Sequence, residues 1–298
     1  MMTPRKMLPF TAGALLLLLP WFGGLTSGEL SPSKFTMCQK FFYNKTPPEG
    51  FGTGHQAICQ RYKNQYRFAT LYDPQKRTAL FSAYLMSSSN RPRPEDTWMY
   101  EPQLASEKER EMKPFPDPVG QNVIKSQAVP ADYADSLYTK GHLAPSQHLN
   151  TDDDRAATFT LTNIVPQREG SNNGPWGDLE TEVLERFNTY CNGQMYVITG
   201  TIPYEPVRLL NNRVSIPEYI WSAYCCPSFR PDPNVKAYFP TYAAVGRNDP
   251  NSGEEIVKKD PSPYAVKEMT LVKLEKILSE RLNKKISLFY QNCQVSKS

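Results

Sequence analysis

The stretch covering residues 137–190 constrains the fold of this chain more than any other. Residues 137–143 predict a short β-strand that carries Gly141 and His142 near its end, and a polar loop rich in Asp follows. Residues 157–165 predict a second strand because apolar, β-favouring side chains dominate them. Pro175 fits the first position of a helix, where its missing N–H costs nothing. Apolar residues then recur at helical spacing, namely Trp176, Leu179, Val183, Phe187 and Tyr190. Two strands and a helix therefore fold back on one another, and polar residues at their junctions converge.

The polar residues of this stretch suit one kind of chemistry. His142 is a neutral base near physiological pH. Asn172, in the loop just before the helix, offers a hard amide oxygen, which Mg²⁺ accepts while keeping most of its water. Glu180 lies about one turn into the helix and can point into the junction, and Asn163 at the end of the second strand can orient an imidazole or a water. With Lys140 as a cation facing phosphate, this set is typical of a phosphodiesterase.

Three motifs in this stretch carry a resemblance to a known family. GHLAP at 141–145, FTLTNIVPQ at 159–167 and NNGPWGDLE at 172–180 resemble the DNA/RNA non-specific endonucleases of the ββα-metal (His-Me finger) class. Their order and spacing match together, which is more specific than any one motif. The resemblance implies an α+β fold with a central, mainly antiparallel sheet and a ββα-metal nuclease core. It also implies hydrolysis of DNA, RNA or both through phosphate contacts, with little sequence preference and a 5′-phosphate product.

The resemblance also implies a role for each matching residue. His142 corresponds to the general base, and Asn172 to the only direct protein ligand of a single Mg²⁺, with Mn²⁺ as a possible substitute. Glu180 corresponds to the residue that holds metal-bound water, and Asn163 supports the histidine. Asn173 competes with its neighbour for the ligand position, although alignment through the following Gly-Pro-Trp favours Asn172.

The sequence departs from the family pattern at two places. The usual Asp-Arg-Gly-His reads Thr139-Lys140-Gly141-His142. Lysine keeps the positive charge of arginine but lacks the planar guanidinium group that binds a phosphate at two points. A basic residue that some relatives carry one turn after the glutamate is Leu184 here, with Arg186 nearby. A catalytically weak or inactive exported module that binds nucleic acid or another partner is therefore the alternative function.

The N-terminal segment predicts export. Arg5 and Lys6 precede an apolar run that ends near Leu19, and small residues follow at 26–28, which is the pattern of a secretory signal peptide over residues 1–28. An uncleaved membrane anchor is the alternative, but the run is short and Pro20 interrupts it. No later segment is long and apolar enough to cross a bilayer. We expect a single nuclease-like domain over residues 29–298, without a transmembrane segment, secreted or held in the lumen of the export pathway.

The cysteines support the same compartment. All six follow the predicted signal peptide: Cys38, Cys59, Cys191, Cys225, Cys226 and Cys293. An even number in an exported chain favours disulfides, and no spacing supports zinc as the alternative. Adjacent cysteines rarely bond to each other. We expect a local Cys38–Cys59 bridge, with Cys191 and Cys293 each bonded to one member of the vicinal pair.

Net charge says little about partners. The chain holds 34 Lys and Arg against 30 Asp and Glu, a formal charge of +4, which is too mild to indicate nucleic-acid binding by itself.

Asn44-Lys45-Thr46 is an N-glycosylation acceptor, which in an exported protein marks surface. The oligomeric state is not predictable from these features.

The rest of the chain predicts elements around the core. A hairpin is expected over 66–72 and 78–86, further strands over 194–201, 218–224 and 235–245, and a helix capped by Thr270. Residues 87–136 lack periodicity and contain many prolines, so we expect a long surface excursion there.

Overall fold

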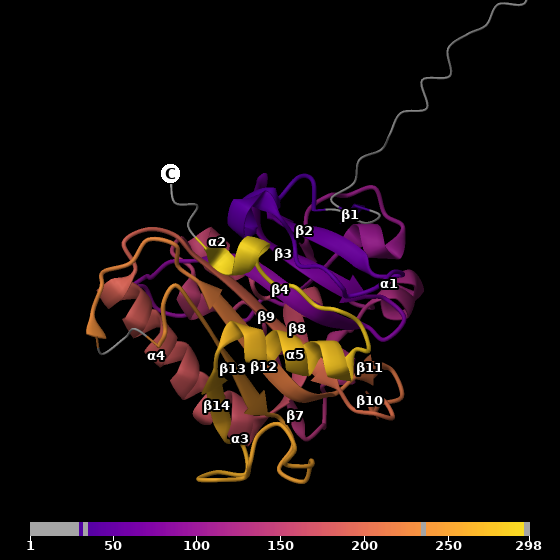
Figure 1. Ribbon diagram of the computed structural model, residues 1–298. Helices are drawn as coiled ribbons and strands as arrows, with labels where there is room; N and C mark the ends of the chain where they lie inside the picture. The colour runs from indigo at the N-terminus through magenta and orange to yellow at the C-terminus, as the bar shows by residue number, and fades with distance from the viewer. Residues whose placement is uncertain (1–29, 32–34, 234–236, 295–298) are drawn as a thin grey trace, which may run out of the picture.

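The structure is a computed structural model that describes residues 30–31, 35–233 and 237–294. Its centre is an eight-stranded sheet in the order β1-β2-β3-β4-β9-β12-β13-β14, and every neighbouring pair is antiparallel (Figure 1). The strands are β1 (Leu30–Ser31), β2 (Gln56–Tyr62), β3 (Gln65–Asp73), β4 (Thr78–Met86), β9 (Met195–Pro203), β12 (Pro217–Cys225), β13 (Thr241–Arg247) and β14 (Val266–Met269). The predicted α+β class with a central antiparallel sheet is confirmed.

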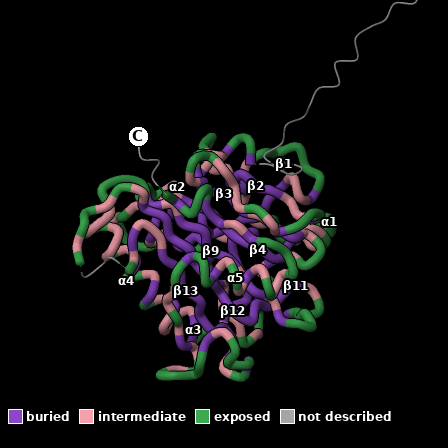
Figure 2. The backbone as a smooth tube through the Cα atoms, viewed as in Figure 1, coloured by how far each residue is buried: buried purple, intermediate pink, exposed green. Residues whose placement is uncertain are grey.

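Both faces of this sheet are covered, because apolar residues point alternately to each side of its central strands. Trp221 of β12 packs in the cluster that contains α5 (Leu271–Arg281). Its neighbour Ile220 packs in the cluster that contains α4 (Pro175–Tyr190). The hydroxyl of Thr270 accepts a hydrogen bond from the Lys273 amide at 3.3 Å, so the predicted cap of α5 is present. Figure 2 shows the buried strands enclosed by exposed loops and outer helix surfaces.

The segment 87–136 is packed more than the prolines suggested. It forms β5 (Met99–Tyr100), β6 (Lys113–Pro114) and α1 (Gln121–Ser126). Tyr100 and Val123 are buried in a small cluster of their own. A short hairpin of β10 (Leu209–Leu210) and β11 (Val214–Ser215) lies elsewhere in the chain. The expectation of a long surface excursion is therefore wrong for this part of the segment. Its apolar side chains show no periodicity in the sequence, but they still pack together in a small core.

Three disulfides link the chain: Cys38–Cys59, Cys191–Cys226 and Cys225–Cys293. The predicted local bridge is confirmed, and so is the division of the vicinal pair between Cys191 and Cys293. Within the described ranges, no helix has the length and apolar character needed to cross a membrane. The predicted signal peptide over 1–28 lies outside the described residues.

Candidate active site

A two-stranded hairpin next to the main sheet carries the Gly-His pair. It pairs β7 (Tyr138–His142) with β8 (Ile164–Arg168) in antiparallel register, with His142 opposite Ile164. Gly141 is required here, because a Cβ at this position would lie 2.2 Å from the side-chain oxygen of Gln167. The first predicted strand is therefore present and places His142 at its end.

The second strand starts later than the sequence suggested. Residues 152–157 form α2 (Asp152–Ala157), and β8 begins only at Ile164, after a 3₁₀ turn over Leu161–Asn163. Thr151 caps α2, and its hydroxyl accepts a hydrogen bond from the Asp154 amide at 3.1 Å. Three acidic residues in the first turn also favour a helix N-terminus. The expectation of an Asp-rich loop was wrong, because the Thr151 cap starts a helix at these residues. The strand expected over 157–165 is present only at its last two residues, 164 and 165.

The helix after the hairpin forms as predicted. Short α3 (Glu169–Asn172) precedes it, and Pro175 occupies the first turn of α4. Trp176, Leu179 and Val183 are buried against the main sheet. This packing fixes the start of α4 beside the hairpin and leaves Asn172 at the junction of the two.

One hollow of about 430 Å³ collects most of the predicted site residues at this junction. Four of them line it: Lys140, His142, Asn172 and Glu180. Asn173 lines it as well, so the structure leaves both asparagines near the same space. Arg93 and Arg155, which sequence reasoning did not single out, complete the cationic side of the wall.

His142 is held as a neutral imidazole. Its side chain is 9% exposed, and its Nε2 is buried without a hydrogen-bond partner among the described residues. Phe159 meets the ring edge-on at a centroid distance of 5.0 Å, and Trp98 lies at 5.8 Å. Burial, and next the charge of Arg93, lowers the pKa of His142 to about 3. The free nitrogen is thus a proton acceptor over the physiological pH range.

The Asn172 side chain is held by a hydrogen bond at the wall of the hollow. Its Nδ2 donates to the hydroxyl of Thr139 at 3.1 Å, and that hydroxyl donates to the Gln167 carbonyl at 2.9 Å. This chain of bonds fixes the amide plane. It uses the nitrogen and leaves Oδ1 as the group available to a cation. Thr139, a departure from the family pattern, therefore has a specific structural role.

Glu180 is a carboxyl group without a cationic contact in the described part of the chain. Its Oε2 accepts a hydrogen bond from Gln147 at 3.0 Å, and burial raises its pKa to about 8. The Glu180 backbone carbonyl lies 2.9 Å from Nε2 of His148, whose other ring nitrogen lies 2.8 Å from the Tyr84 hydroxyl. His148 is thus a structural residue that anchors α4 to β4.

Lys140 and Asn163 have different surroundings. The Lys140 ammonium lies over the rings of Trp98 at 5.0 Å and Tyr133 at 5.7 Å, which holds it beside His142. Asn163 does not line the hollow. It is completely buried, and its side chain bonds to the backbone of Ala144, just after His142.

Arg93 and Arg155, which the sequence alone did not indicate, have different surroundings. Arg93 is largely exposed, with 58% of its side chain accessible, and its charge lowers the pKa of both His142 and Glu180. Arg155 is 4% exposed and donates to the backbone carbonyls of Ser146 and Arg91. Arg93 lies 49 positions before His142 in the sequence. The only sequence signal for its role is that it is one of two arginines among prolines. Arg186, the other basic candidate, bonds to Glu268 through two nitrogens at 2.9 Å.

An antiparallel hairpin followed by a helix, with a histidine on the first strand and an asparagine before the helix, defines the ββα-metal class of nucleases. The sequence agrees with this assignment. Residues 49–254 match the DNA/RNA non-specific endonuclease family, and the chain belongs to that family.

Individual relatives support the assignment. The chain is 34% identical over 224 residues to human endonuclease domain-containing 1 protein, covering 72% of this chain and 43% of that protein. A nuclease from Nostoc is 31% identical over 164 residues, or 53% of this chain and 51% of the relative. The chain therefore spans about half the length, or less, of these relatives. A crystal structure of the EndoG/EndoGI complex shares the fold, with a TM-score of 0.50 and 15% identity over 83% of this chain and 90% of that one.

Proposed function

We propose that this protein is a Mg²⁺-dependent endonuclease that cleaves DNA, RNA or both without sequence preference, with His142 as its general base. One observation carries the proposal. Nε2 of His142 is buried and has no hydrogen-bond partner among the described residues, and His142 lines the same hollow as Asn172 and Glu180. A neutral imidazole with one nitrogen free in this way is suited to take a proton from a reactant that enters this space.

His142 accepts a proton from water, which attacks phosphorus in line. The bond to the 3′-oxygen breaks, and this oxygen takes a proton from solvent to leave as a hydroxyl group. Trp98 and Phe159 restrict the imidazole, so its orientation does not have to be fixed during the reaction. A bound phosphate would place negative charge beside the ring. This charge offsets part of the effect of Arg93 and raises the pKa of the base toward the working pH.

The residues present fit a hydrated divalent cation. Asn172 supplies a neutral hard oxygen, and Glu180 supplies a carboxyl group that burial leaves protonated near neutral pH until a cation approaches. No cluster of three or more His, Cys, Asp or Glu side chains suited to a metal occurs among the described residues. Most ligands would therefore be water, held in part by Glu180. Bound there, the ion would stabilise negative charge on the phosphate and on the leaving oxygen.

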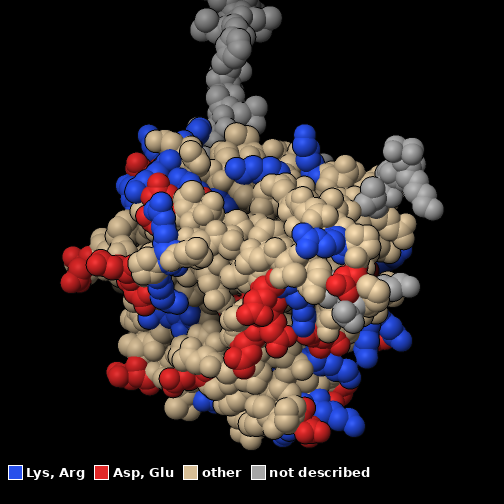
Figure 3. All heavy atoms as spheres, turned by 90° about the vertical axis from the view of Figure 1, so that its left-hand side faces the viewer, with Lys and Arg blue, Asp and Glu red and all other residues tan. Residues whose placement is uncertain are grey.

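Lys140 and Arg93 contact the substrate phosphates. Both side chains lie on the wall of the hollow with His142. Contacts of this kind read the backbone and not the bases, which gives little sequence preference. On the surface facing the viewer in Figure 3, patches of Lys and Arg alternate with Asp and Glu, so attraction for nucleic acid is local.

A second candidate function is nucleic-acid binding without turnover. It is favoured by the pKa of His142, which at about 3 makes the imidazole a weak base in the free protein. Lysine at position 140, in place of the arginine of the family pattern, also favours binding without turnover. Lysine cannot form the two parallel hydrogen bonds by which arginine holds a phosphate.

The two functions are separated by a plasmid-nicking assay in Mg²⁺, with and without chelator, run beside a gel-shift measurement. The nuclease proposal expects nicking that the chelator abolishes and Mn²⁺ restores. Asn172→Ala should lower the rate far more than Asn173→Ala, since the proposal assigns the ligand role to Asn172 alone. Binding without nicking under all metal conditions would support the second function and end the first.

We further propose that residues 29–298 form one exported domain, secreted or retained in the lumen of the export pathway. Three disulfides support an oxidising compartment. Asn44 is exposed, which suits a glycan at this position.

A further inference from the structure

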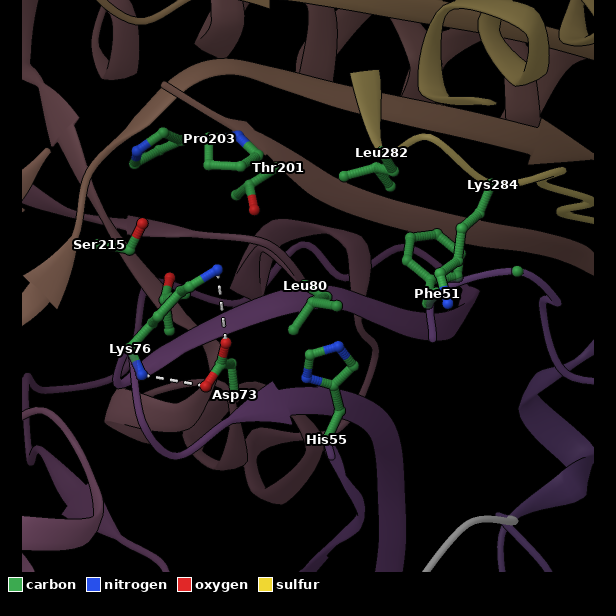
Figure 4. Close-up of a pocket in the computed structure, with 13 residues that line it drawn as sticks. Phe51, His55, Asp73, Lys76, Leu80, Thr201, Pro203, Ser215, Leu282 and Lys284 are labelled. Atoms are coloured by element: carbon green, nitrogen blue, oxygen red, sulfur yellow. Dashed lines mark hydrogen bonds and ion pairs between the residues drawn. The ribbon is translucent and has the colours of Figure 1, made fainter. Parts of the chain in front are cut away.

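A second cavity lies away from the candidate active site. It has a volume of about 150 Å³ and is enclosed by segments that are far apart in the sequence (Figure 4). They comprise the loop that contains Phe51 and His55, the ends of β3 and β4, the end of β9, and the turn after α5 with Leu282 and Lys284. This cavity belongs to the α5 side of the main sheet, whereas His142 lies with α4 beyond the other face.

The walls of this cavity are fixed before any ligand enters. Phe51 packs edge-on against Phe81 at 5.0 Å and is stacked with Trp221 at 6.3 Å. Its loop is tied to the C-terminal segment by two backbone hydrogen bonds between Glu49 and Ser287, at 2.8 and 3.2 Å. A preformed cavity of this kind loses little conformational entropy when it is filled.

The cavity has an apolar body and a cationic end. Phe51, Leu80 and Leu282 provide apolar wall. Lys284 and His55 line the cationic end. A methyl group built on Gly52, which does not itself line the cavity, would lie 3.5 Å from Nζ of Lys284 and 4.0 Å from Nε2 of His55, so both nitrogens are close to one point beside the cavity. In addition, Nδ1 of His55 is buried and has no hydrogen-bond partner among the described residues.

The one carboxylate of the cavity is already compensated. Asp73 accepts hydrogen bonds from the amides of Gln75 and Lys76 at 2.9 and 3.0 Å, and its second oxygen lies 3.9 Å from Nζ of Lys76. Lys284 forms no ion pair within the described residues. The net charge that the cavity offers to a ligand is therefore positive, and it is concentrated at Lys284.

We propose that this cavity binds a small organic carboxylate with a compact apolar body. The carboxylate lies between Lys284 and His55, and the apolar body lies against Phe51, Leu80 and Leu282. The size of the cavity limits the ligand, because pockets for drug-sized molecules measure roughly 300–1,000 Å³. Neutral molecules of the same shape lack the charge-assisted hydrogen bond to Lys284 and bind more weakly.

The chain offers a direct spectroscopic test, because it contains only three histidines. Benzoate is titrated into the full chain with isotope-labelled histidine, and benzyl alcohol and benzylamine serve as neutral and cationic probes of the same shape. Benzoate should shift the ring signals of His55 saturably, with a dissociation constant below about 1 mM. The signals of His148, on the other side of the sheet, should stay in place. The result is independent of nuclease activity, since His142→Ala should bind benzoate equally well.

Two variants decide whether the binding is the proposed one. Lys284→Ala should weaken benzoate binding at least about fivefold, as expected for loss of a charge-assisted contact. Lys285→Ala, at a neighbouring residue that does not line the cavity, should not. Leu80→Phe should fill the cavity and abolish the shift, with thermal unfolding used to confirm that the variant folds. Absence of a His55 shift would overturn the proposal. So would equal binding of benzyl alcohol, or an affinity unchanged by Lys284→Ala.

Discussion

Asn163 and Ala144 are joined by a reciprocal pair of hydrogen bonds. The Ala144 amide donates to Oδ1 of Asn163, and Nδ2 of Asn163 donates to the Ala144 carbonyl, both at 3.0 Å. The same side chain also accepts from the Ser82 hydroxyl at 2.8 Å and donates to the Thr158 carbonyl at 3.0 Å. A single buried amide thus ties the chain after His142 to the main sheet, and we therefore expect Asn163 to act as a positioning residue.

Replacing this amide should affect both folding and turnover. Asn163→Ala leaves the buried N–H and C=O of Ala144 unsatisfied, which should cost about 2–4 kcal/mol of unfolding free energy. The measurement is urea denaturation, with the exposed Asn188→Ala as control. Where the variant still folds, kcat should fall with KM nearly unchanged, because the substrate contacts remain. A variant with wild-type stability and kcat would contradict the positioning role.

The pKa of Glu180 predicts an unusual pH dependence of stability. Its value is about 8 in the folded protein, against 4.5 for the ordinary group. Between these values the folded state binds the proton more tightly than the unfolded state, so this group makes the protein less stable as pH rises from 4.5 to 8. Glu180→Gln should therefore gain stability relative to wild type at pH 8 compared with pH 5, while losing nuclease activity.

Thermal unfolding at both pH values checks this prediction. Glu185→Gln, an exposed change on the same helix, is the matched control and should show no pH-dependent gain. Mg²⁺ should reduce the difference between wild type and Glu180→Gln, because a bound cation favours the charged carboxylate. An identical pH response in both variants would show that Glu180 is not buried as described.

His142 should titrate far below an ordinary histidine. Burial and the charge of Arg93 lower its pKa to about 3 from 6.5. Stability contributed by the neutral ring is then lost as pH falls from 6.5 toward 3, where only the unfolded state takes up the proton. NMR titration of the ring should show no protonation above about pH 5. Arg93→Gln should raise the midpoint, and a wild-type midpoint near 6.5 would refute the buried environment.

The Cys225–Cys293 bridge should contribute substantially to stability. It closes a sequence separation of 68 residues and attaches the C-terminal segment to β12. The double change of both cysteines to serine should cost about 4 kcal/mol in a chain-entropy estimate. Denaturation of the variant beside the wild type measures this cost. A loss below about 1 kcal/mol would indicate that the C-terminal segment is held mainly by packing.

The sequence predicted which polar residues come together better than it predicted the local structure around them. His142, Asn172 and Glu180 share one hollow because each lies at a junction that hydrophobic periodicity and Pro175 already defined. The boundary of β8 was missed, since the Thr151–Asp154 capping interaction turned an apparent loop into helix.

The remaining features depend on tertiary contacts that no local pattern encodes. Arg93 reaches the hollow from a proline-rich segment, and its effect on His142 is purely spatial. Asn163 looked like a group that orients a ring or a water directly, whereas its bonds go to the backbone of Ala144 and Thr158 and to the Ser82 hydroxyl. The cavity beside Lys284 brings together segments separated by more than 200 residues, and sequence reasoning did not find it.

The role of His142 as general base is tested most directly by the plasmid-nicking rate. This rate is compared between His142→Ala and wild type in Mg²⁺, at equal amounts of folded protein. Loss of a general base is expected to lower the rate by about 10²–10⁴-fold, while gel-shift affinity for the same DNA stays within a few-fold. A variant that nicks at the wild-type rate, or a wild-type protein that does not nick at all, would contradict the central claim.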